Sequence, residues 1–276
     1  MLFELHSHTT YSHGAKVYHE GMNTPEEMVK ETARLGLDGI AITDHNRIEG
    51  ALEAMRYAKK YDVMVIPGEE VSSRDGHILG LGIEKHVQPG RSTEKTVEDI
   101  HEQGGIAIAP HPFDIRSKGI GKKSVKCDAI EVFNSMNIER SSNRKNIKFV
   151  EQVGKPYTVG SDAHDKYMIG STVNKIKGDT MEDILESIKK GGIEVKMDYI
   201  PLATIKKWAL NRLQSSYGYT TNYINRNYKG PKKMLSKYLL SKVKKPESHK
   251  KFFNFLSYVA IFGTVTYGLL HAAKPL

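Results

Sequence analysis

The chain is organised around one stretch near its N-terminus, Leu5-His6-Ser7-His8-Thr9-Thr10-Tyr11-Ser12-His13-Gly14. An apolar-leaning run, 1–5, precedes the first histidine and predicts a short strand that ends there. Residues two apart in a strand share a face, so His6 and His8 can bind one metal ion, and His13 can reach the same cluster after a turn. A purification tag would have contiguous histidines, whereas these are spaced, so the stretch predicts a metal site.

The composition suits a globular α/β protein. The chain has 276 residues, 39% of them hydrophobic, with 24 Gly and 10 Pro. This length is enough for one large barrel, or for one medium domain with an appendage. The single cysteine, Cys127, excludes an internal disulfide and favours a reducing compartment.

The positive net charge comes from the C-terminal part of the chain. Residues 1–201 hold 27 Lys and Arg against 31 Asp and Glu, a balance of −4. Residues 202–276 hold 14 Lys and Arg against one acidic residue, Glu247, a balance of +13. We expect chemistry in the first part and an anionic partner for the second.

Apolar runs and helical patterns alternate through the first 200 residues. Strands are predicted at 3–6, 39–43, 63–67, 77–83, 106–110, 129–133 and 157–161, and helices at 24–36, 48–61, 93–103, 139–153 and 180–190. Thr24 and Thr180 each begin a helix with an acidic residue three positions on, as in a capping box. Strand and helix in alternation imply parallel strands, and about seven repeats imply a closed or nearly closed barrel.

The predicted strand ends carry imidazoles and carboxylates. Barrel enzymes have their chemistry at the C-terminal ends of the strands. The candidate metal ligands at these ends are His6, His8, His13, His45, Glu69, His77, His111, Asp162 and His164. Nine ligands exceed the needs of one ion, so two or three divalent ions are expected, with Glu69 able to bridge two of them. Imidazole with carboxylate suits Zn, Mn or Fe.

The order of these motifs resembles the PHP (polymerase and histidinol phosphatase) family. The resemblance covers about residues 2–176 and rests on His6-x-His8, Thr43-Asp44-His45, Glu69, His111-Pro112 and Ser161-Asp162-Ala163-His164. It implies a distorted (β/α)7 TIM-like barrel with a trinuclear metal centre that hydrolyses phosphoric esters. The short barrel, with the His77 strand soon after Glu69, resembles the stand-alone phosphoesterase and exonuclease branch more than the histidinol phosphatases.

The resemblance also implies how the ligands are shared. One ion would be bound by His6, His8, Glu69 and Asp162, a second by Glu69, His77 and His111, and a third by His13, His45 and His164. Many members of that branch have Ser-Asp-Gly where this chain has Ser12-His13-Gly14, so the third ion is expected to differ. The expected nucleophile is a metal-bound hydroxide, with Asp44 orienting an imidazole.

Three further residues are candidates for contact with the substrate phosphate. Asn134 lies at a strand end, and Arg116 and Arg144 lie in the predicted adjoining loops. Arginine can bind phosphate through bidentate hydrogen bonds, although an arginine in a loop is also commonly a solvated surface group.

The amino-acid composition of the chain changes after residue 200. We predict three parts: a barrel at 1–200, a basic, aromatic-rich helical linker at 201–251, and a hydrophobic helix at 252–273. The last stretch is long enough to cross a membrane, which predicts a cytoplasmic catalytic domain tethered by a C-terminal helix. A helix packed on the barrel or lying in the membrane interface is the alternative.

The same C-terminal region predicts several partners. Residues 202–273 are expected to bind an anionic membrane surface, and residues 202–251 could form a nucleic-acid-binding arm; one segment could do both. Small residues recur every four positions at Ala260, Thr264, Gly268 and Ala272, which predicts a homodimer through the helix.

The sequence therefore predicts a metal-dependent phosphoric ester hydrolase. Its substrate would be a phosphomonoester, a nucleotide or an oligonucleotide end, the last implying an exonuclease. The alternative is a noncatalytic metal-binding module that recruits partners or a membrane through its tail.

Overall fold

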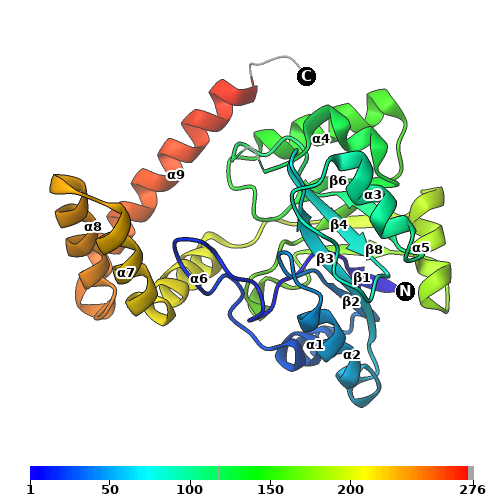
Figure 1. Cartoon of the computed structure of the whole chain (residues 1–276), viewed down its shortest axis with the longest axis horizontal. Coiled ribbons are helices and arrows are strands. Elements are labelled where there is room, and N and C mark those ends of the chain that lie inside the picture. Colours follow the sequence, from blue (N-terminus) through cyan, green and yellow to red (C-terminus); the bar gives the residue numbers. More distant parts are fainter. Residues whose placement is uncertain (117, 273–276) are drawn as a thin grey trace.

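The computed structural model describes residues 1–116 and 118–272, and one sheet dominates it (Figure 1). Within the described residues the sheet has nine strands in the order β7-β6-β5-β4-β3-β2-β1-β8-β9. The strands are β1 (Leu2–Glu4), β2 (Gly39–Ile42), β3 (Met64–Ser72), β4 (His77–Leu81), β5 (Ile106–Ala109), β6 (Ala129–Asn134), β7 (Tyr157–Gly160), β8 (Thr172–Lys175) and β9 (Glu194–Met197).

The sheet curves until its two ends meet. The side chain of Asn174 on β8 bonds both to the amide and to the carbonyl of Val159 on β7. Beyond the strands, Ser7 and Ala163 form a parallel bridge, so the chain after β1 runs beside the chain after β7. The prediction of an α/β fold with a nearly closed barrel and a C-terminal helical tail is confirmed.

The barrel is less regular than alternating parallel units. β4 pairs antiparallel with both β3 and β5, and β8 pairs antiparallel with β1 and β9. β3 and β4 are joined by a four-residue turn, 73–76, in place of a helix. The sequence therefore predicted β1 to β7 but missed β8 and β9, and the parallel pairing that it implied holds for only part of the sheet.

Helices cover the outside of the sheet. Their bounds are α1 (Pro25–Arg34), α2 (Glu49–Tyr61), α3 (Thr93–His101), α4 (Ser141–Val153) and α5 (Met181–Lys190), with 3-10 turns at Gly121–Lys126 and Lys166–Met168. Thr24 and Thr180 each form the predicted capping box, with Glu27 and Asp183 respectively.

The core leaves one end of the barrel polar. Phe3, Leu5, Ile66 and Ile108 fill the barrel interior and form one apolar cluster with α5 residues such as Ile184. Because α5 and this cluster occupy one end, the polar side chains collect at the other end, where the parallel strands finish.

Four α-helices form the C-terminal region within the described residues (Figure 1). They are α6 (Leu202–Ser215), α7 (Tyr217–Asn227), α8 (Gly230–Lys242) and α9 (Lys250–Ala272), with a 3-10 turn at Glu247–His249. Trp208 on α6 belongs to the apolar core of the barrel, whereas α7, α8 and the start of α9 bury a small cluster of their own. α9 then runs back toward α4.

The predicted membrane tether is wrong. None of the helices in the described residues is both long enough and apolar enough to cross a bilayer. Polar residues such as Asn254, Ser257 and Thr264 dilute α9, and Asn254 accepts a hydrogen bond from Lys206 on α6. Residue 273, the last of the predicted stretch, lies outside the described residues.

The small-residue stripe on α9 is partly occupied by the chain itself. Gly268 is buried, and a Cβ atom there would lie 2.6 Å from Cγ of Glu139, just before α4. Ala260, by contrast, is exposed. The homodimer therefore stays a prediction, with less free surface on α9 than the sequence pattern indicated.

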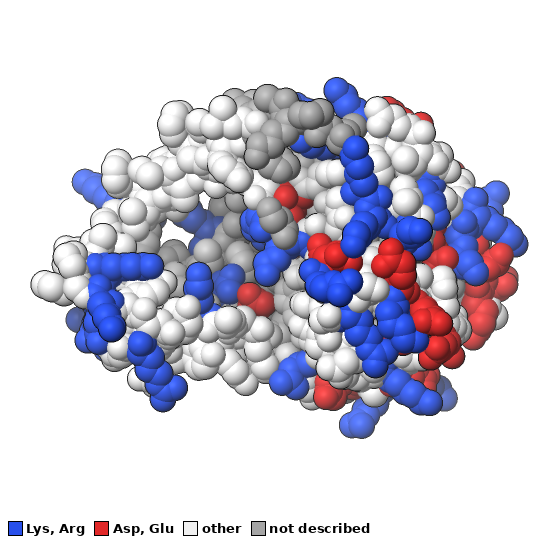
Figure 2. Space-filling model, turned by 45° about the horizontal axis from the view of Figure 1, so that its top comes forward, with Lys and Arg blue, Asp and Glu red and all other residues white. Residues whose placement is uncertain are grey.

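The charge separation read from the sequence is visible on the surface. On the face drawn in Figure 2, Lys and Arg occur over the helical region, whereas Lys and Arg mix with Asp and Glu over the barrel. The two regions therefore differ in charge as well as in packing.

Candidate metal centre

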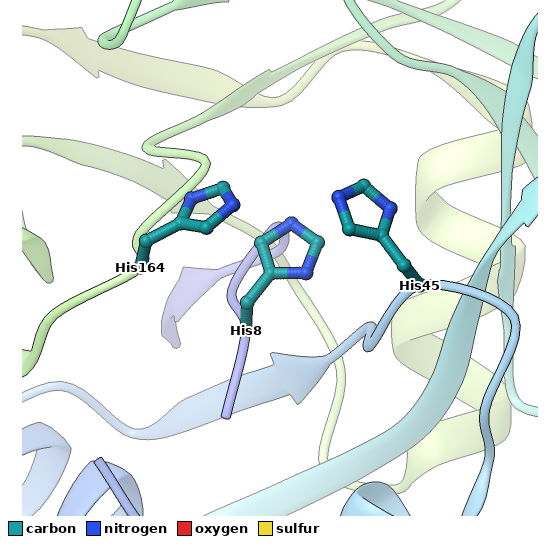
Figure 3. A group of neighbouring side chains, drawn as sticks. All are labelled: His8, His45 and His164. Carbon is teal, nitrogen blue, oxygen red and sulfur yellow. The ribbon is translucent and has the colours of Figure 1, made fainter. Parts of the chain in front are cut away.

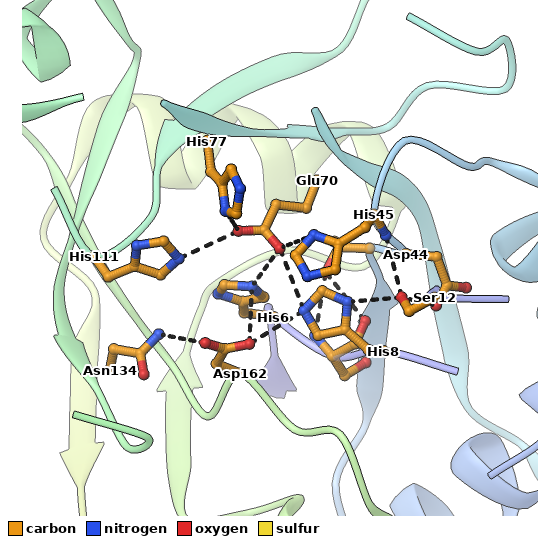
Figure 4. Close-up of polar contacts among 12 residues, drawn as sticks. His6, His8, Ser12, Asp44, His45, Glu70, His77, His111, Asn134 and Asp162 are labelled. Carbon is orange, nitrogen blue, oxygen red and sulfur yellow. Dashed lines mark hydrogen bonds and ion pairs between the residues drawn. The ribbon is translucent and has the colours of Figure 1, made fainter. Parts of the chain in front are cut away.

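Glu70 lies at the centre of a ring of histidines at the polar end of the barrel (Figure 4). Its Oε2 lies 2.8 Å from His45 Nδ1, 3.4 Å from His8 Nε2 and 3.6 Å from His6 Nε2. Its Oε1 lies 2.7 Å from His77 Nδ1 and 3.2 Å from His111 Nε2. One buried carboxylate thus contacts five of the imidazoles that the sequence singled out.

Glu69, which we expected in this role, points elsewhere. β3 continues to Ser72, past its predicted end at residue 67, so Glu69 and Glu70 are neighbours within a strand and face opposite ways. Glu69 Oε1 lies 2.9 Å from His86 Nδ1, and Oε2 accepts a hydrogen bond from the Val87 amide. The geometry therefore replaces Glu69 by Glu70 in the candidate ligand set.

His77 reaches the centre from an antiparallel strand. It is the first residue of β4 and pairs with Ser72, the last residue of β3. Because β4 runs opposite to its neighbours, the start of β4 lies at the same rim as the ends of the parallel strands. We listed His77 among residues at the C-terminal ends of strands, but it lies at the N-terminal end of an antiparallel strand.

Asp162 is the second central carboxylate. Its Oδ1 lies 3.2 Å from His8 Nε2 and 3.6 Å from His6 Nε2, as the predicted closure of the barrel requires. The backbone of Asp162 has φ +54°, a left-handed conformation that is rare outside glycine. Such strain is typical of functional positions, where the surrounding structure fixes the residue.

The ligand atoms form four overlapping groups, each within 4.8 Å. The groups are His6, His8 and Glu70; His6, His111 and Asp162; His45, Glu70 and His77; and His8, His45 and His164. Figure 3 shows the three rings of the last group turned toward one another.

A buried nitrogen without a partner tests whether these residues fit metal ions. His6 Nε2 has no hydrogen-bond partner among the described residues, although His6 is fully buried. It lies 3.6 Å from an oxygen of Glu70 and 3.6 Å from an oxygen of Asp162, too far for a hydrogen bond. An ion with ligands about 2.0 to 2.2 Å away fits between atoms at such separations. The site therefore fits divalent metals.

The protonation states of His8 and His164 agree with this assignment. Burial and the charge on His45 lower the pKa of His8 from 6.5 to about 4, and burial and His8 lower the pKa of His164 to about 3. These two rings are therefore neutral near pH 7, the form that binds metal. For His45, burial lowers the pKa, but the charge on Glu70 outweighs it and raises the pKa to about 9, so this ring must lose its proton when it binds an ion. Burial alone would raise the pKa of Glu70, but His77 and His45 outweigh it and keep that pKa well below its usual value.

His13 lies at the cavity wall, outside the four groups. Its ring stacks on Tyr18, with centroids 4.1 Å apart. In the expected third ligand set, the structure brings His8 together with His45 and His164 in place of His13.

Glu131 and Asn134 support the centre from β6. Glu131 Oε1 lies 2.8 Å from His6 Nδ1, and its Oε2 accepts the amide of His111. Asn134, a predicted substrate contact, donates to Glu131 and to Asp162, and its side-chain oxygen accepts the Met136 amide. Its amide group is thus engaged within the protein, where it orients both carboxylates.

Asp44 acts on the histidines through Ser12. Its carboxylate accepts hydrogen bonds from the amide and hydroxyl of Thr9 and from the Ser12 hydroxyl. Ser12 Oγ lies 3.1 Å from His8 Nδ1 and accepts the amide of His45. Asp44 therefore orients His8, and Ser12, which we did not single out, is the link.

The centre opens into a cavity of about 380 Å³. Arg116, Lys118 and Arg212 line it beside the histidines, and Asp114 holds the Arg116 Nε at 3.1 Å. Arg144 lines a different cavity, together with Ile261 and Val265 of α9. Arg116 is thus a candidate for substrate contact, whereas the prediction for Arg144 is not supported.

The fold and this centre define a barrel protein with a candidate site for divalent metal ions. The sequence matches the PHP domain family over residues 4–239. The chain belongs to that family, and the match runs past the predicted domain boundary at residue 200 into α8. A PHP domain with His and Glu clusters of this kind indicates divalent metal ions and phosphoesterase chemistry in general terms.

Two curated relatives share parts of the chain. An uncharacterized protein of Methanocaldococcus jannaschii is 37% identical over 141 residues, which are 49% of this chain and 82% of that protein. The phosphoribosyl 1,2-cyclic phosphate 1,2-diphosphodiesterase of Eggerthella lenta is 33% identical over 91 residues, 31% of this chain and 32% of that enzyme. The chain thus spans only about a third of that enzyme's length.

A solved structure shares the fold. It is a two-domain protein from Bacteroides vulgatus that contains a predicted PHP-like metal-dependent phosphoesterase. The TM-score is 0.59 at 16% identity, covering 72% of this chain and 65% of that one.

Proposed function

We propose that this protein hydrolyses phosphoric esters with two or three divalent ions bound around Glu70 and Asp162. The observation that carries the proposal is the position of Glu70, whose two oxygens face different sets of imidazoles. A carboxylate in this position can bridge two ions, as phosphoesterase chemistry at a dinuclear centre requires.

The ligands favour Zn, Mn or Fe. The four groups consist of imidazoles and carboxylates, which suit these metals better than an all-oxygen shell would. The chemistry that divalent ions supply in such a site is the acidification of water and the neutralisation of phosphate charge.

The residues of the chain have separate tasks in this proposal. Glu131, Asn134 and Asp44 orient the ligands, Asp44 through Ser12. Arg116, with its guanidinium fixed by Asp114, is suited to bind a phosphate oxygen, and Lys118 adds positive charge beside it.

The cavity suggests the size of the substrate. A volume of about 380 Å³ suits a small phosphomonoester, a nucleotide or the terminal nucleotide of an oligonucleotide. The basic helix α8 is compatible with a longer anionic partner, so binding of residues 202–273 to nucleic acid or to an anionic surface stays a prediction.

The proposal is tested by turnover. Purified protein loaded with Mn or Zn is incubated with a generic phosphomonoester, with nucleotides and with 5′-phosphorylated oligonucleotides. We expect metal-dependent release of phosphate or nucleotide, and none from the His6→Ala/His8→Ala double variant. If no ester in this panel is hydrolysed in a metal-dependent way, the noncatalytic alternative holds.

A further inference from the structure

We propose that Glu20 is an additional metal ligand, completing the group formed by His8, His45 and His164, and that helix α6 holds it in position. The inference rests on the proposed function, because both require ions at this centre. It goes beyond that function by assigning a residue that lies outside the motifs of the sequence and by connecting the C-terminal helices to the metal site.

The group of His8, His45 and His164 lacks a carboxylate. Each of the other three groups contains a carboxylate, whereas this group consists of the imidazoles of His8, His45 and His164 alone. A carboxylate beside them would offset part of the charge of a divalent ion.

Glu20 is suitably located to supply that carboxylate. Its Oε2 lies 3.5 Å from His45 Nε2, while the other nitrogen of His45 faces Glu70. Glu20 also lines the same cavity as His45 and His164. A nitrogen–oxygen separation of 3.5 Å is longer than a good hydrogen bond and compatible with two ligands of one ion.

A small hairpin brings Glu20 to this position. The amide of Glu20 donates to the carbonyl of Ser12, and the amide of Gly14 donates to the carbonyl of Tyr18. A Cβ atom on Gly14 would lie 2.6 Å from the Val17 carbonyl oxygen and 2.7 Å from Glu20 Oε1. Glycine at position 14 therefore allows the hairpin to fold tightly enough to direct Glu20 toward His45.

Helix α6 holds Glu20 from the other side. Arg212 donates to Glu20 Oε1 at 3.3 Å, which leaves Oε2 facing His45. Trp208 Nε1 donates to the backbone carbonyl of Glu20 at 2.9 Å, and its ring lies 5.2 Å from the ring of His164. A helix from the C-terminal region thus touches both a proposed ligand and a histidine of the same group.

The competing explanation is that Glu20 only forms an ion pair with Arg212. Loss of that ion pair would alter the packing of α6 without changing the number of ions bound. Metal content therefore separates the two explanations, and turnover alone does not.

The test compares Glu20→Gln with wild type and with Glu186→Gln, an exposed glutamate of α5 that is remote from the cavity lining. Each protein is loaded with Mn or Zn, dialysed and analysed for metal per chain, and the affinity is measured by titration calorimetry. The fluorescence of Trp208, the only tryptophan of the chain, reports binding near His164.

We expect Glu20→Gln to bind one ion fewer than wild type, or to bind its weakest ion at least tenfold less tightly, with a smaller fluorescence change. Arg212→Ala should weaken the same ion by about tenfold or more, as losses of supporting contacts to a metal ligand do. Glu186→Gln should match wild type. Gly14→Ala should resemble Glu20→Gln without removing a charged group.

The outcomes distinguish this inference from the proposed function. If Glu20→Gln binds as many ions as wild type, with the same affinity, Glu20 is not a ligand, and the inference fails while the proposed function stands. If Glu20→Gln keeps its full metal content but loses turnover, Glu20 acts on substrate, and the inference again fails. If wild type binds no ion, both fail.

Discussion

The barrel and the C-terminal helices bury apolar surface in different ways. The barrel has two large clusters of buried side chains, inside and outside the sheet. Helices α7, α8 and the start of α9 share a small cluster around Ile224, Leu240 and Val243. Helix α6 is the exception, because Trp208 packs into the barrel core and contacts the metal site. Helix α6 therefore packs more closely with the barrel than the later helices do, while the domain boundary at residue 200 stays a prediction.

Breaking the contact between α6 and the barrel should lower the stability of the protein more than any other change considered below. Trp208→Ala removes a side chain that is 9% exposed and its hydrogen bond to Glu20. We expect the free energy of unfolding to fall by about 3 to 5 kcal/mol, measured by urea denaturation followed by circular dichroism. A loss below about 1 kcal/mol would mean that α6 belongs with the other C-terminal helices.

The reactivity of the single cysteine, Cys127, tests whether the barrel stays closed around it. Burial and the nearby Asp128 raise the pKa of the Cys127 thiol to about 12. Since the thiolate is the reactive form, we expect a thiol reagent at pH 8 to react about a thousandfold more slowly with the native protein than with the urea-unfolded protein. The rate should rise as the pH approaches 12. Rapid reaction at pH 8 would show that the barrel opens at this position.

Loss of the hydrogen-bonded link between Asp44 and His8 should reduce activity to an intermediate extent. Ser12→Ala removes the hydroxyl that lies between them, so we expect a fall in kcat/KM of about 10- to 100-fold. The matched control is Ser257→Ala on α9, whose hydroxyl bonds only to the carbonyl of Phe253 among the contacts described. Equal activities of the two variants would remove Ser12 from the proposed centre.

The C-terminal cluster should affect stability alone. Leu240→Ala opens a cavity in that cluster, and we expect a loss of about 2 kcal/mol in local stability, measured by hydrogen exchange of α8. Leu235→Ala, on the same helix but 58% exposed, should change it by less than about 0.5 kcal/mol. Both variants should keep wild-type kcat/KM. A tenfold loss of activity in Leu240→Ala would connect α8 to the site.

Sequence reasoning succeeded for the barrel because its signals are local. Apolar runs, capping boxes and the spacing of the histidines all lie within short stretches, so β1 to β7 and α1 to α5 could be identified close to their observed bounds, apart from the end of β3. The short strands β8 and β9 were missed. The partnership of Asp162 with His6 and His8 followed from closure of the barrel.

The remaining features depend on contacts that no short stretch reveals. The choice between Glu69 and Glu70 depends on where β3 ends, and the run 68–72 contains too few alternating residues to fix it. Glu20 has a hydrogen-bond partner on α6, and Ser12 has one just after β2. The 22 residues without Asp, Glu, Lys or Arg predicted a membrane span, but their polar residues dilute the helix too much.

The most direct test of the account is the metal content of two isosteric variants, Glu70→Gln and Glu69→Gln, measured by elemental analysis after loading with Mn or Zn. Both residues are buried, adjacent and on the same strand, so they differ chiefly in the direction of the side chain. The account predicts that Glu70→Gln loses at least one ion per chain and that Glu69→Gln keeps the wild-type number. Loss of metal from Glu69→Gln with full retention by Glu70→Gln would contradict it.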